Sequence, residues 1–321
     1  EPSATRQFRD FVSLLKESPA EFEFKRSHAQ RWNDLWEVDP LRVQTGRVDR
    51  HSDAHPSVEA ALAEIFGKSF ALPTADLKMP LGIDVRARPP VVAFVNFWTG
   101  RARATMSYYL ARMGRYEPMI REIFKEEGVP EDMIFLCLIE SGFSPRAHSI
   151  ANAGGMWQFI PATAVNYGLR IDGEVDERRD PVKATRAAAR LLRNLYEKLG
   201  SWPLAMAGYN AGSGHVIKAM RKANSDNYWA LARRGTLYDN TRDYVAKILA
   251  AGLIANNRAV FGFEAVVPHP PLQHDSVQVP GGTPVPTPED LPAIDADPAR
   301  CADPATAARM ADEVDAAKRE G

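Results

Sequence analysis

The sequence predicts a mainly α-helical protein, and three features of its pattern support this. Apolar residues recur at intervals of three and four in many segments, which places them on one face of a helix. No long segment alternates apolar and polar residues with the period of two that is typical of strands. Several helical segments also begin at a proline or capping residue and end at a glycine. The core is therefore expected to consist of packed helices.

The composition is that of a folded globular protein. The chain has 321 residues, of which 45% are apolar and 25% charged, enough for one large domain with appendages. Lys and Arg number 40 against 41 Asp and Glu, without a polybasic run, so nucleic acid is not an expected partner. No stretch approaches 18 consecutive apolar residues, so no membrane-spanning helix is expected. The chain starts at Glu1 and not at Met, which leaves open a removed targeting segment.

Residues 1–88 are expected to form a helical N-terminal extension. Apolar residues recur at helical spacing in segments 8–15 and 58–66. The polar stretch between these segments carries no recognisable chemistry, and we expect it to pack on the surface.

The helical pattern strengthens after residue 89, and residues 89–262 are expected to form one domain. Asp180 and Pro181 have the character of an N-cap and first turn, and Gly200 that of a helix stop. The predicted helices are, in order, residues 91–98, 101–112, a short separate helix opened by Pro118, one that starts at Pro130, one between Pro181 and Gly200, and one over residues 244–253.

The C-terminal residues 263–321 are expected to form a Pro-rich linker or tail. The stretch from Pro268 to Pro304 holds 10 of the 24 prolines, which prevents regular helix. Residues 305–320 are compatible with one short terminal helix.

The helix that starts at Pro130 ends in a carboxylate. An acidic first turn leads into seven apolar residues, 133–139, and a helix that is apolar on every side belongs in a protein interior. Glu140 follows at once, and Gly142 and Pro145 then end the helix. Burial and the negative end of the helix dipole both disfavour the ionised carboxylate, so we expect the pKa of Glu140 to be raised. A carboxyl group that is protonated near neutral pH is suited to general acid catalysis.

This helix alone leaves two interpretations open. Glu140 is either a catalytic acid or a buried carboxylate paired with an arginine, for which Arg146 or Arg112 is available. Cys137, in the same apolar run, is expected to be a buried and inert thiol. Cys137 and the distant Cys301 lack the spacing of a zinc site, so neither a metal nor a cofactor is expected.

Three blocks of sequence that follow the helix carry a family resemblance. They are Glu140-Ser141-Gly142-Phe143-Ser144-Pro145-Arg146-Ala147-His148-Ser149, then Gly155-Met156-Trp157-Gln158-Phe159-Ile160-Pro161-Ala162-Thr163-Ala164, then Gly208-Tyr209-Asn210-Ala211-Gly212. Together and in this order they resemble the soluble lytic transglycosylase family, most closely its membrane-bound lytic transglycosylase D branch. The resemblance covers about residues 89–261, and it implies that residues 89–262 are a lysozyme-like catalytic domain.

The resemblance implies a peptidoglycan lytic transglycosylase with Glu140 as the only catalytic carboxylate. Glu140 then protonates the glycosidic oxygen between N-acetylmuramic acid and N-acetylglucosamine, and an oxocarbenium-like state develops. The ionised Glu140 next removes the proton from the C6 hydroxyl group, which closes a 1,6-anhydro ring without water. A second carboxylate, as in most glycosidases, is not needed.

The resemblance also implies a set of substrate-binding residues, which are Ser149, Gln158, Tyr209, Met156, Ile160, Asn210 and Tyr244. Ser149, Gln158 and Tyr209 have the alternative roles of capping, turn stabilisation and core packing. Asn210 is well suited to fix the local backbone before the glycines that follow it.

Three positions depart from the usual pattern of the family. Asn152 stands where glycine is common, Gly208 where alanine is usual, and Asn240 where an acidic residue often precedes the following Thr-Arg pair. These departures concern the loop geometry and substrate preference, and none of them replaces the acid.

Two other functions remain as alternatives. A hydrolytic muramidase of the goose-lysozyme kind needs a second carboxylate, for which Asp172, Glu174, Asp176 and Asp180 are candidates. Asp180 is better explained as a helix cap, and the other three as solvated loop charges. The second alternative is a catalytically idle scaffold that binds peptidoglycan.

The expected partners are peptidoglycan glycan strands, and cell-wall proteins are left open as further partners of a monomer. The expected location is the periplasm or cell envelope, with a removed signal or a lipid anchor to the outer membrane left open.

Overall fold

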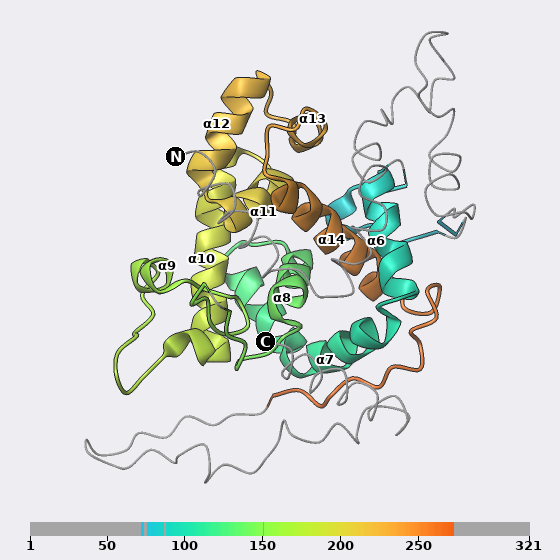
Figure 1. The fold of residues 1–321 in the computed structure, drawn as a ribbon. Coiled ribbons are helices and arrows are strands. Elements are labelled where there is room, and N and C mark those ends of the chain that lie inside the picture. Colours follow the sequence, from blue (N-terminus) through green and yellow to red (C-terminus); the bar gives the residue numbers. More distant parts are fainter. Residues whose placement is uncertain (1–71, 74–75, 87, 150, 273–321) are drawn as a thin grey trace, which may run out of the picture.

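The computed structural model describes residues 72–73, 76–86, 88–149 and 151–272 (Figure 1). The expected helices at residues 8–15, 58–66 and 305–320 lie outside this part of the chain, as does Cys301.

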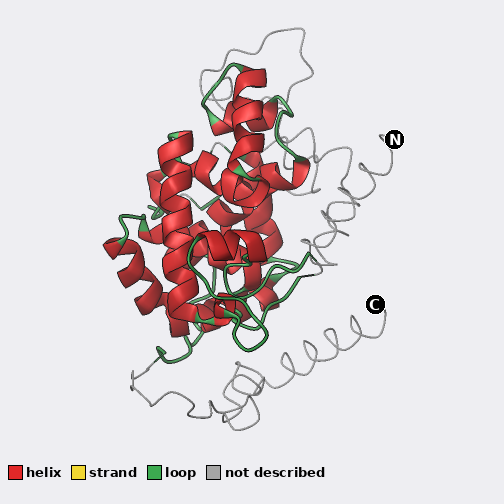
Figure 2. Ribbon diagram, turned by 90° about the vertical axis from the view of Figure 1, so that its left-hand side faces the viewer, coloured by secondary structure: helices red, strands yellow, loops and turns green. Residues whose placement is uncertain are grey.

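The described residues are mainly helical, and Figure 2 shows helices joined by loops without a strand among them. The prediction of a mainly α fold is confirmed. The α-helices are α6 (Pro89–Thr99), α7 (Arg103–Glu126), α8 (Ile134–Ser141), α9 (Pro161–Asn166), α10 (Pro181–Leu199), α11 (Trp202–Ala211), α12 (Ser213–Ala223), α13 (Tyr228–Arg233) and α14 (Asp239–Asn256). Three short 3-10 helices, η1 (Pro80–Gly82), η2 (Glu131–Met133) and η3 (Glu177–Arg179), complete the set. None of the described helices is both long and apolar enough to span a membrane.

Helix α8 lies in the interior of the domain, and the long helices α7 and α14 pack against it (Figure 1). Its residues Leu136, Cys137 and Leu138 are fully buried, as the uninterrupted apolar run predicted. Helix α14 crosses α8 so closely that a Cβ atom on Gly252 would lie 2.6 Å from the Phe135 ring. Helices α7, α14 and η2 contact α8 directly, so its position is set from several sides.

The ends of α8 and α10 follow local chemistry. The segment after Pro130 starts as the 3-10 turn η2 before it becomes α8. Gly142 ends α8 in the left-handed conformation, with φ 56°, and its N–H donates to the Leu138 carbonyl. Asp180 caps α10 as predicted, since its carboxylate accepts from the N–H groups of Val182 and Lys183.

The prediction of a separate helix at Pro118 is wrong, because Pro118 lies inside the continuous helix α7. Proline lacks the N–H that would bond to the fourth residue before it, which usually ends or kinks a helix. Here the helix continues because apolar residues on both sides of the proline, such as Met113 and Ile120, are buried in the same core.

An extended segment, residues 263–272, follows α14 and lies along α7 (Figure 1). The N–H groups of His269 and Leu272 donate to the carbonyls of Ala111 and Arg115 on α7. Gly114 leaves space for this approach, since a Cβ atom there would collide with Pro268. The described part of the Pro-rich region is thus packed against the helical domain, and we call it the strap.

Candidate active site

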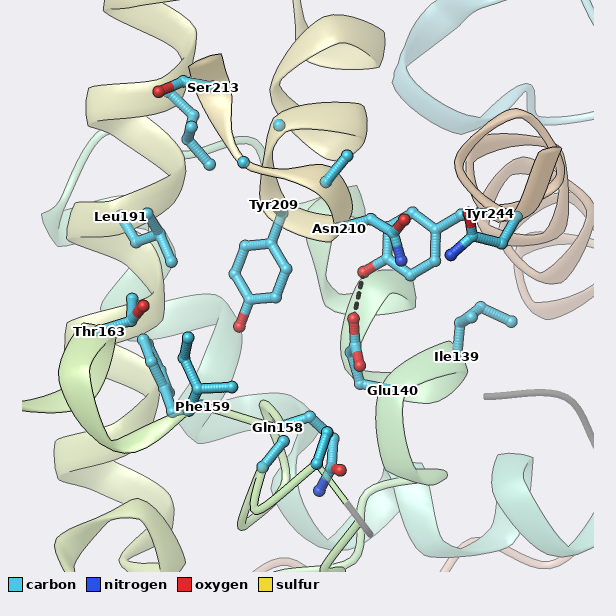
Figure 3. Close-up of a pocket in the computed structure, with 18 of the residues that line it drawn as sticks. Ile139, Glu140, Gln158, Phe159, Thr163, Leu191, Tyr209, Asn210, Ser213 and Tyr244 are labelled. Carbon is cyan, nitrogen blue, oxygen red and sulfur yellow. Dashed lines mark hydrogen bonds between the residues drawn. The ribbon is translucent and has the colours of Figure 1, made fainter. Parts of the chain in front are cut away.

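A cavity of about 640 Å³ opens beside the C-terminal end of α8. It is enclosed by α9, α10, α11, α14 and the loop of residues 147–160 (Figure 3). Of the predicted site residues, the cavity is lined by Glu140, Ser149, Gln158, Ile160, Tyr209, Asn210 and Tyr244. The fold therefore collects residues that are more than 100 positions apart in sequence.

Glu140 lies in the last turn of α8 and is half-buried at the cavity wall. The hydroxyl group of Tyr244, on α14, donates a hydrogen bond of 2.6 Å to Glu140 Oε1 (Figure 3). Burial, and then the charge of Glu140 together with this hydrogen bond, raise the pKa of Tyr244 well above its ordinary value. Tyr244 therefore stays a neutral donor and holds one carboxyl oxygen in place.

Arg112 and Arg146, the two arginines considered as partners of Glu140, differ in their positions and contacts. Arg112 donates to the Gly142 carbonyl over 3.2 Å, and its guanidinium group lies 4.3 Å from the centre of the Tyr108 ring. Arg146 is exposed. Arg112 thus anchors the C-terminal end of α8, the end that carries Glu140.

Tyr209 connects α11 to the loop of residues 147–160. Its hydroxyl group donates to the Trp157 carbonyl over 2.7 Å, and burial raises the pKa of Tyr209 well above its ordinary value. The Trp157 indole is fully buried, donates to Thr185 on α10 and contacts the Phe124 ring. Trp157 is therefore a core residue that supports the loop.

Gln158 and Ser149 line the cavity and also stabilise the loop to which they belong. The Gln158 amide nitrogen donates to the Gly155 and Ala147 carbonyls over 2.8 and 3.3 Å. The Ser149 hydroxyl accepts from the Ala153 N–H over 3.0 Å. Both side chains thus make the local contacts that were their alternative roles, which are capping for Ser149 and turn stabilisation for Gln158. Both also line the cavity.

Met156 and Ile160, which were predicted together, lie in different places. Met156 is 1% exposed and is not among the residues that line the cavity; its carbonyl accepts from the Ser141 hydroxyl over 2.7 Å. Ile160 is 48% exposed at the cavity wall. The Met156 carbonyl therefore supports the end of α8, and the buried Met156 side chain does not line the cavity.

Asn210 connects two helices beside Glu140. Its Oδ1 accepts a hydrogen bond of 2.8 Å from the hydroxyl of Thr241, a fully buried residue on α14. The contact holds α11 against the helix that carries Tyr244, which agrees with a role in fixing the local structure.

The positions that depart from the family pattern have structural explanations where the contacts are known. Asn152 has φ 59°, a left-handed conformation that asparagine tolerates better than most residues. A Cβ atom on Gly208 would lie 2.8 Å from Leu199 and 3.0 Å from Leu195, so glycine lets α11 approach α10 closely. Asn240 lines the cavity one helical turn before Tyr244.

The structure places two lysines at the cavity, and an ion pair near it, that the sequence analysis did not single out. Lys198 and Lys247 line it, and Glu140 is the only Asp or Glu among the described residues that line it. The interpretation of Asp176 as a solvated loop charge is wrong, because its carboxylate pairs with the buried Arg178 behind the cavity loop. Nothing in the run of charges around residue 176 marked one of them as buried.

Within the described ranges, no group of three or more His, Cys, Asp or Glu side chains is arranged to hold a metal ion.

Comparisons with known proteins agree with the motifs. A sequence model of the transglycosylase SLT domain matches residues 118–232. The chain is 38% identical over 235 residues to membrane-bound lytic murein transglycosylase D of Escherichia coli K12, an alignment that covers 68% of this chain and 51% of that protein. It is 30% identical over 155 residues to membrane-bound lytic murein transglycosylase C of Haemophilus ducreyi, with 43% of this chain and 40% of that protein covered.

The chain is also similar to a solved structure, that of the 70 kDa soluble lytic transglycosylase of Escherichia coli. That similarity has a TM-score of 0.46 and 16% identity, and it covers 74% of this chain and 47% of the other. This chain spans about half the length of the transglycosylase D relative. The resemblance predicted from the three sequence blocks is confirmed: residues 118–232 match the transglycosylase SLT domain, and the chain is similar to the membrane-bound lytic murein transglycosylases.

Proposed function

We propose that the chain is a lytic transglycosylase that cleaves the β-1,4 bond between N-acetylmuramic acid and N-acetylglucosamine in peptidoglycan. One observation carries the proposal: the cavity beside α8 is lined by a single carboxylate, Glu140, which Tyr244 holds by a hydrogen bond. The relatives named above, which are murein transglycosylases, support the substrate class.

In the proposed reaction Glu140 acts twice. As an acid it donates its proton to the glycosidic oxygen, and the bond from that oxygen to the muramic acid C1 breaks. The ionised Glu140 then accepts the proton of the muramic acid C6 hydroxyl group while O6 forms a bond to C1. Glu140 ends in its starting state, and no water is consumed. Tyr244 remains a donor to the carboxyl group at both stages because the raised pKa keeps its hydroxyl group protonated.

The remaining cavity residues are proposed to bind the sugars. The walls around Glu140 carry polar groups and one exposed apolar side chain, which belong to Gln158, Ser149, Tyr209, Asn210 and Ile160. Sugars and their acetamido groups match such a mixed wall, since they offer hydrogen-bonding groups and apolar ring faces.

A hydrolytic muramidase is less well supported. None of the four candidate second carboxylates lines the cavity. Asp180 caps α10, and Asp176 pairs with Arg178. Asp172 accepts from the N–H groups of Glu174 and Val175, and the side chain of Glu174 is 87% exposed. With one carboxylate in the cavity, attack by the substrate's own hydroxyl group is the simpler chemistry.

The proposed setting is the cell envelope, where the glycan strands are. The membrane-bound relatives support this location. We further propose that residues 89–262 hold the catalytic domain.

The test is digestion of purified sacculi, with the products identified by mass spectrometry. We expect products one water lighter than those of a hydrolase, and a loss of activity of about a thousandfold or more in Glu140→Gln. Glu174→Gln is the matched control, because it makes the same change at an exposed carboxylate, and it should keep full activity. Equal activity of Glu140→Gln and the wild type would refute the assignment, and hydrated products would identify a muramidase.

A further inference from the structure

The loop of residues 147–160 carries Ser149 and Gln158 into the cavity, and its conformation needs support. Its described residues form turns and isolated bridges at His148, Gly154 and Phe159, without a helix or strand. Two of its non-glycine residues, Asn152 and Gln158, have positive φ, which costs free energy for residues with a side chain. Such a loop keeps one conformation only if surrounding contacts hold it.

Arg178 supplies these contacts from behind the loop. Its Nη1 donates to the carbonyls of Asn152 and Phe159, over 2.6 and 3.0 Å. One of these residues lies three positions after Ser149, and the other directly follows Gln158. A single guanidinium group therefore ties together the two branches of the loop that present the cavity side chains.

Asp176 fixes the guanidinium group itself. Its two oxygens accept from Nε and Nη2 of Arg178, each over 2.8 Å, in the planar two-bond geometry that only arginine offers. Arg178 is 4% exposed, and this pairing neutralises its buried charge. The hydrogen bond from Arg178 also lowers the pKa of Asp176, which keeps the pair ionised.

The loop backbone is shaped around Arg178. A Cβ atom on Gly154 would lie 3.0 Å from the guanidinium carbon, and one on Gly155 would overlap the Arg178 carbonyl oxygen. Both positions thus lack a side chain where the loop meets Arg178. The fit is specific on both sides of the contact.

We propose that Arg178, held by Asp176, is a positioning residue for substrate binding, which acts through the loop and never touches the glycan. This inference rests on the proposed function of the cavity. Loss of the two carbonyl contacts lets Gln158 and Ser149 move, while Glu140 and Tyr244 stand on α8 and α14 and keep their geometry. Substrate binding should suffer, and the protonation behaviour of Glu140 should not.

The test measures cleavage of a soluble glycan fragment by Arg178→Met, Arg178→Lys and Asp176→Asn in the full chain. We expect kcat/KM to fall about tenfold or more, with most of the change in KM and an unchanged pH profile. Lysine keeps the charge but not the planar fork, so it should not restore binding. A further variant, Arg178→Ala, tests chemical rescue. Millimolar guanidinium should partly restore its kcat/KM, and urea, which carries no charge, should not. Arg186→Met is the matched control: Arg186 pairs with Glu126 and Glu127 at the C-terminal end of α7, and its loss should change kcat/KM less than about twofold.

A double-mutant cycle separates positioning from general destabilisation. If Arg178 acts through Gln158, Arg178→Met should reduce kcat/KM much less in a Gln158→Ala background than in the wild type. If Arg178→Met does not fold, Asp176→Asn takes its place in the cycle. Full additivity, or kcat/KM within twofold of the wild type, would overturn the inference. Failure of the proposed function is distinguishable, because then the wild type itself, or Glu140→Gln, would give the contradicting result.

Discussion

At the residue scale, the candidate site depends on which groups touch the carboxyl group of Glu140. Tyr244 donates to it directly, whereas the hydroxyl group of Tyr209 is used by the Trp157 carbonyl. Cys137 lies one turn before Glu140, and burial, followed by the charge of Glu140, raises the pKa of its thiol well above the ordinary value. Cys137 therefore remains a neutral packing residue, whereas Tyr244 acts directly on the acid.

Replacement of Tyr244 by phenylalanine tests this contact. We expect Tyr244→Phe to lower kcat about a hundredfold, because a fixed donor to the catalytic carboxyl group is lost. The free energy of unfolding should fall by about 1 kcal/mol, the usual cost of one hydrogen bond. Both quantities can be measured by sacculus digestion and chemical denaturation.

Tyr228→Phe provides the control for that variant. Tyr228 is also buried, and its hydroxyl group donates over 2.6 Å to the Arg242 carbonyl, but it does not line the cavity. A similar loss of stability with unchanged kcat is expected. If the two variants lose activity equally, the direct role of Tyr244 is wrong.

At the scale of the elements, the site is a meeting of helix ends and faces. Glu140 stands at the end of α8, Tyr244 on the face of α14, and Tyr209 near the end of α11. The distance between the first two therefore depends on how closely α14 approaches α8. That approach is possible because Gly252 has no side chain where it meets Phe135 and Pro80.

Gly252→Ala tests this helix contact. Alanine is the better helix former, yet its Cβ would lie 2.6 Å from the Phe135 ring and 2.9 Å from Pro80. We expect a loss of about 1 to 3 kcal/mol in the free energy of unfolding, together with reduced activity. Gly214→Ala on α12 is the matched control, since nothing lies within 4 Å of a Cβ there, and it should be neutral or slightly stabilising. Thermal melting of both variants decides, and equal effects would contradict the close approach.

At the scale of the whole molecule, the strap follows the domain boundary predicted at residue 262 and packs against the helical domain. It bonds to the carbonyls of Ala111 and Arg115, and Arg103 lies 4.5 Å from the centre of the Phe263 ring. Helix α7, on which it lies, also carries Arg112, which anchors the end of α8. We propose that the strap supports the site of the catalytic domain through α7.

Gly114→Ala tests the strap in the full chain. The new methyl group would collide with Pro268, so the strap should separate from α7 although alanine favours the helix itself. We expect a lower melting temperature and faster proteolytic cleavage within residues 263–272. Unchanged cleavage and melting would show that the strap is not held at this position.

Much of the fold was predictable from the sequence because it depends on local patterns. The apolar run before Glu140 predicted a buried helix, Asp180 and Gly200 marked the ends of α10, and the three motif blocks predicted the family. The prediction at Pro118 failed because burial on both sides of the proline, a property of the whole core, outweighed the local preference to start a new helix there.

What the sequence by itself determined is the helical pattern, the family and the list of polar residues from which a site could be built. Only the tertiary structure decided which of them meet: Tyr244 reaches Glu140 across 104 positions, and Met156 supports the end of α8 while Gln158, two residues later, lines the cavity. It also decided that the half-buried carboxylate of Asp176 pairs with the buried Arg178 behind the cavity loop and is not a solvated surface charge. The physical reason is that helix periods and caps arise from neighbours in the chain. Contacts between side chains and distant carbonyls depend on how the helices and the loop pack together, and no local pattern encodes that packing.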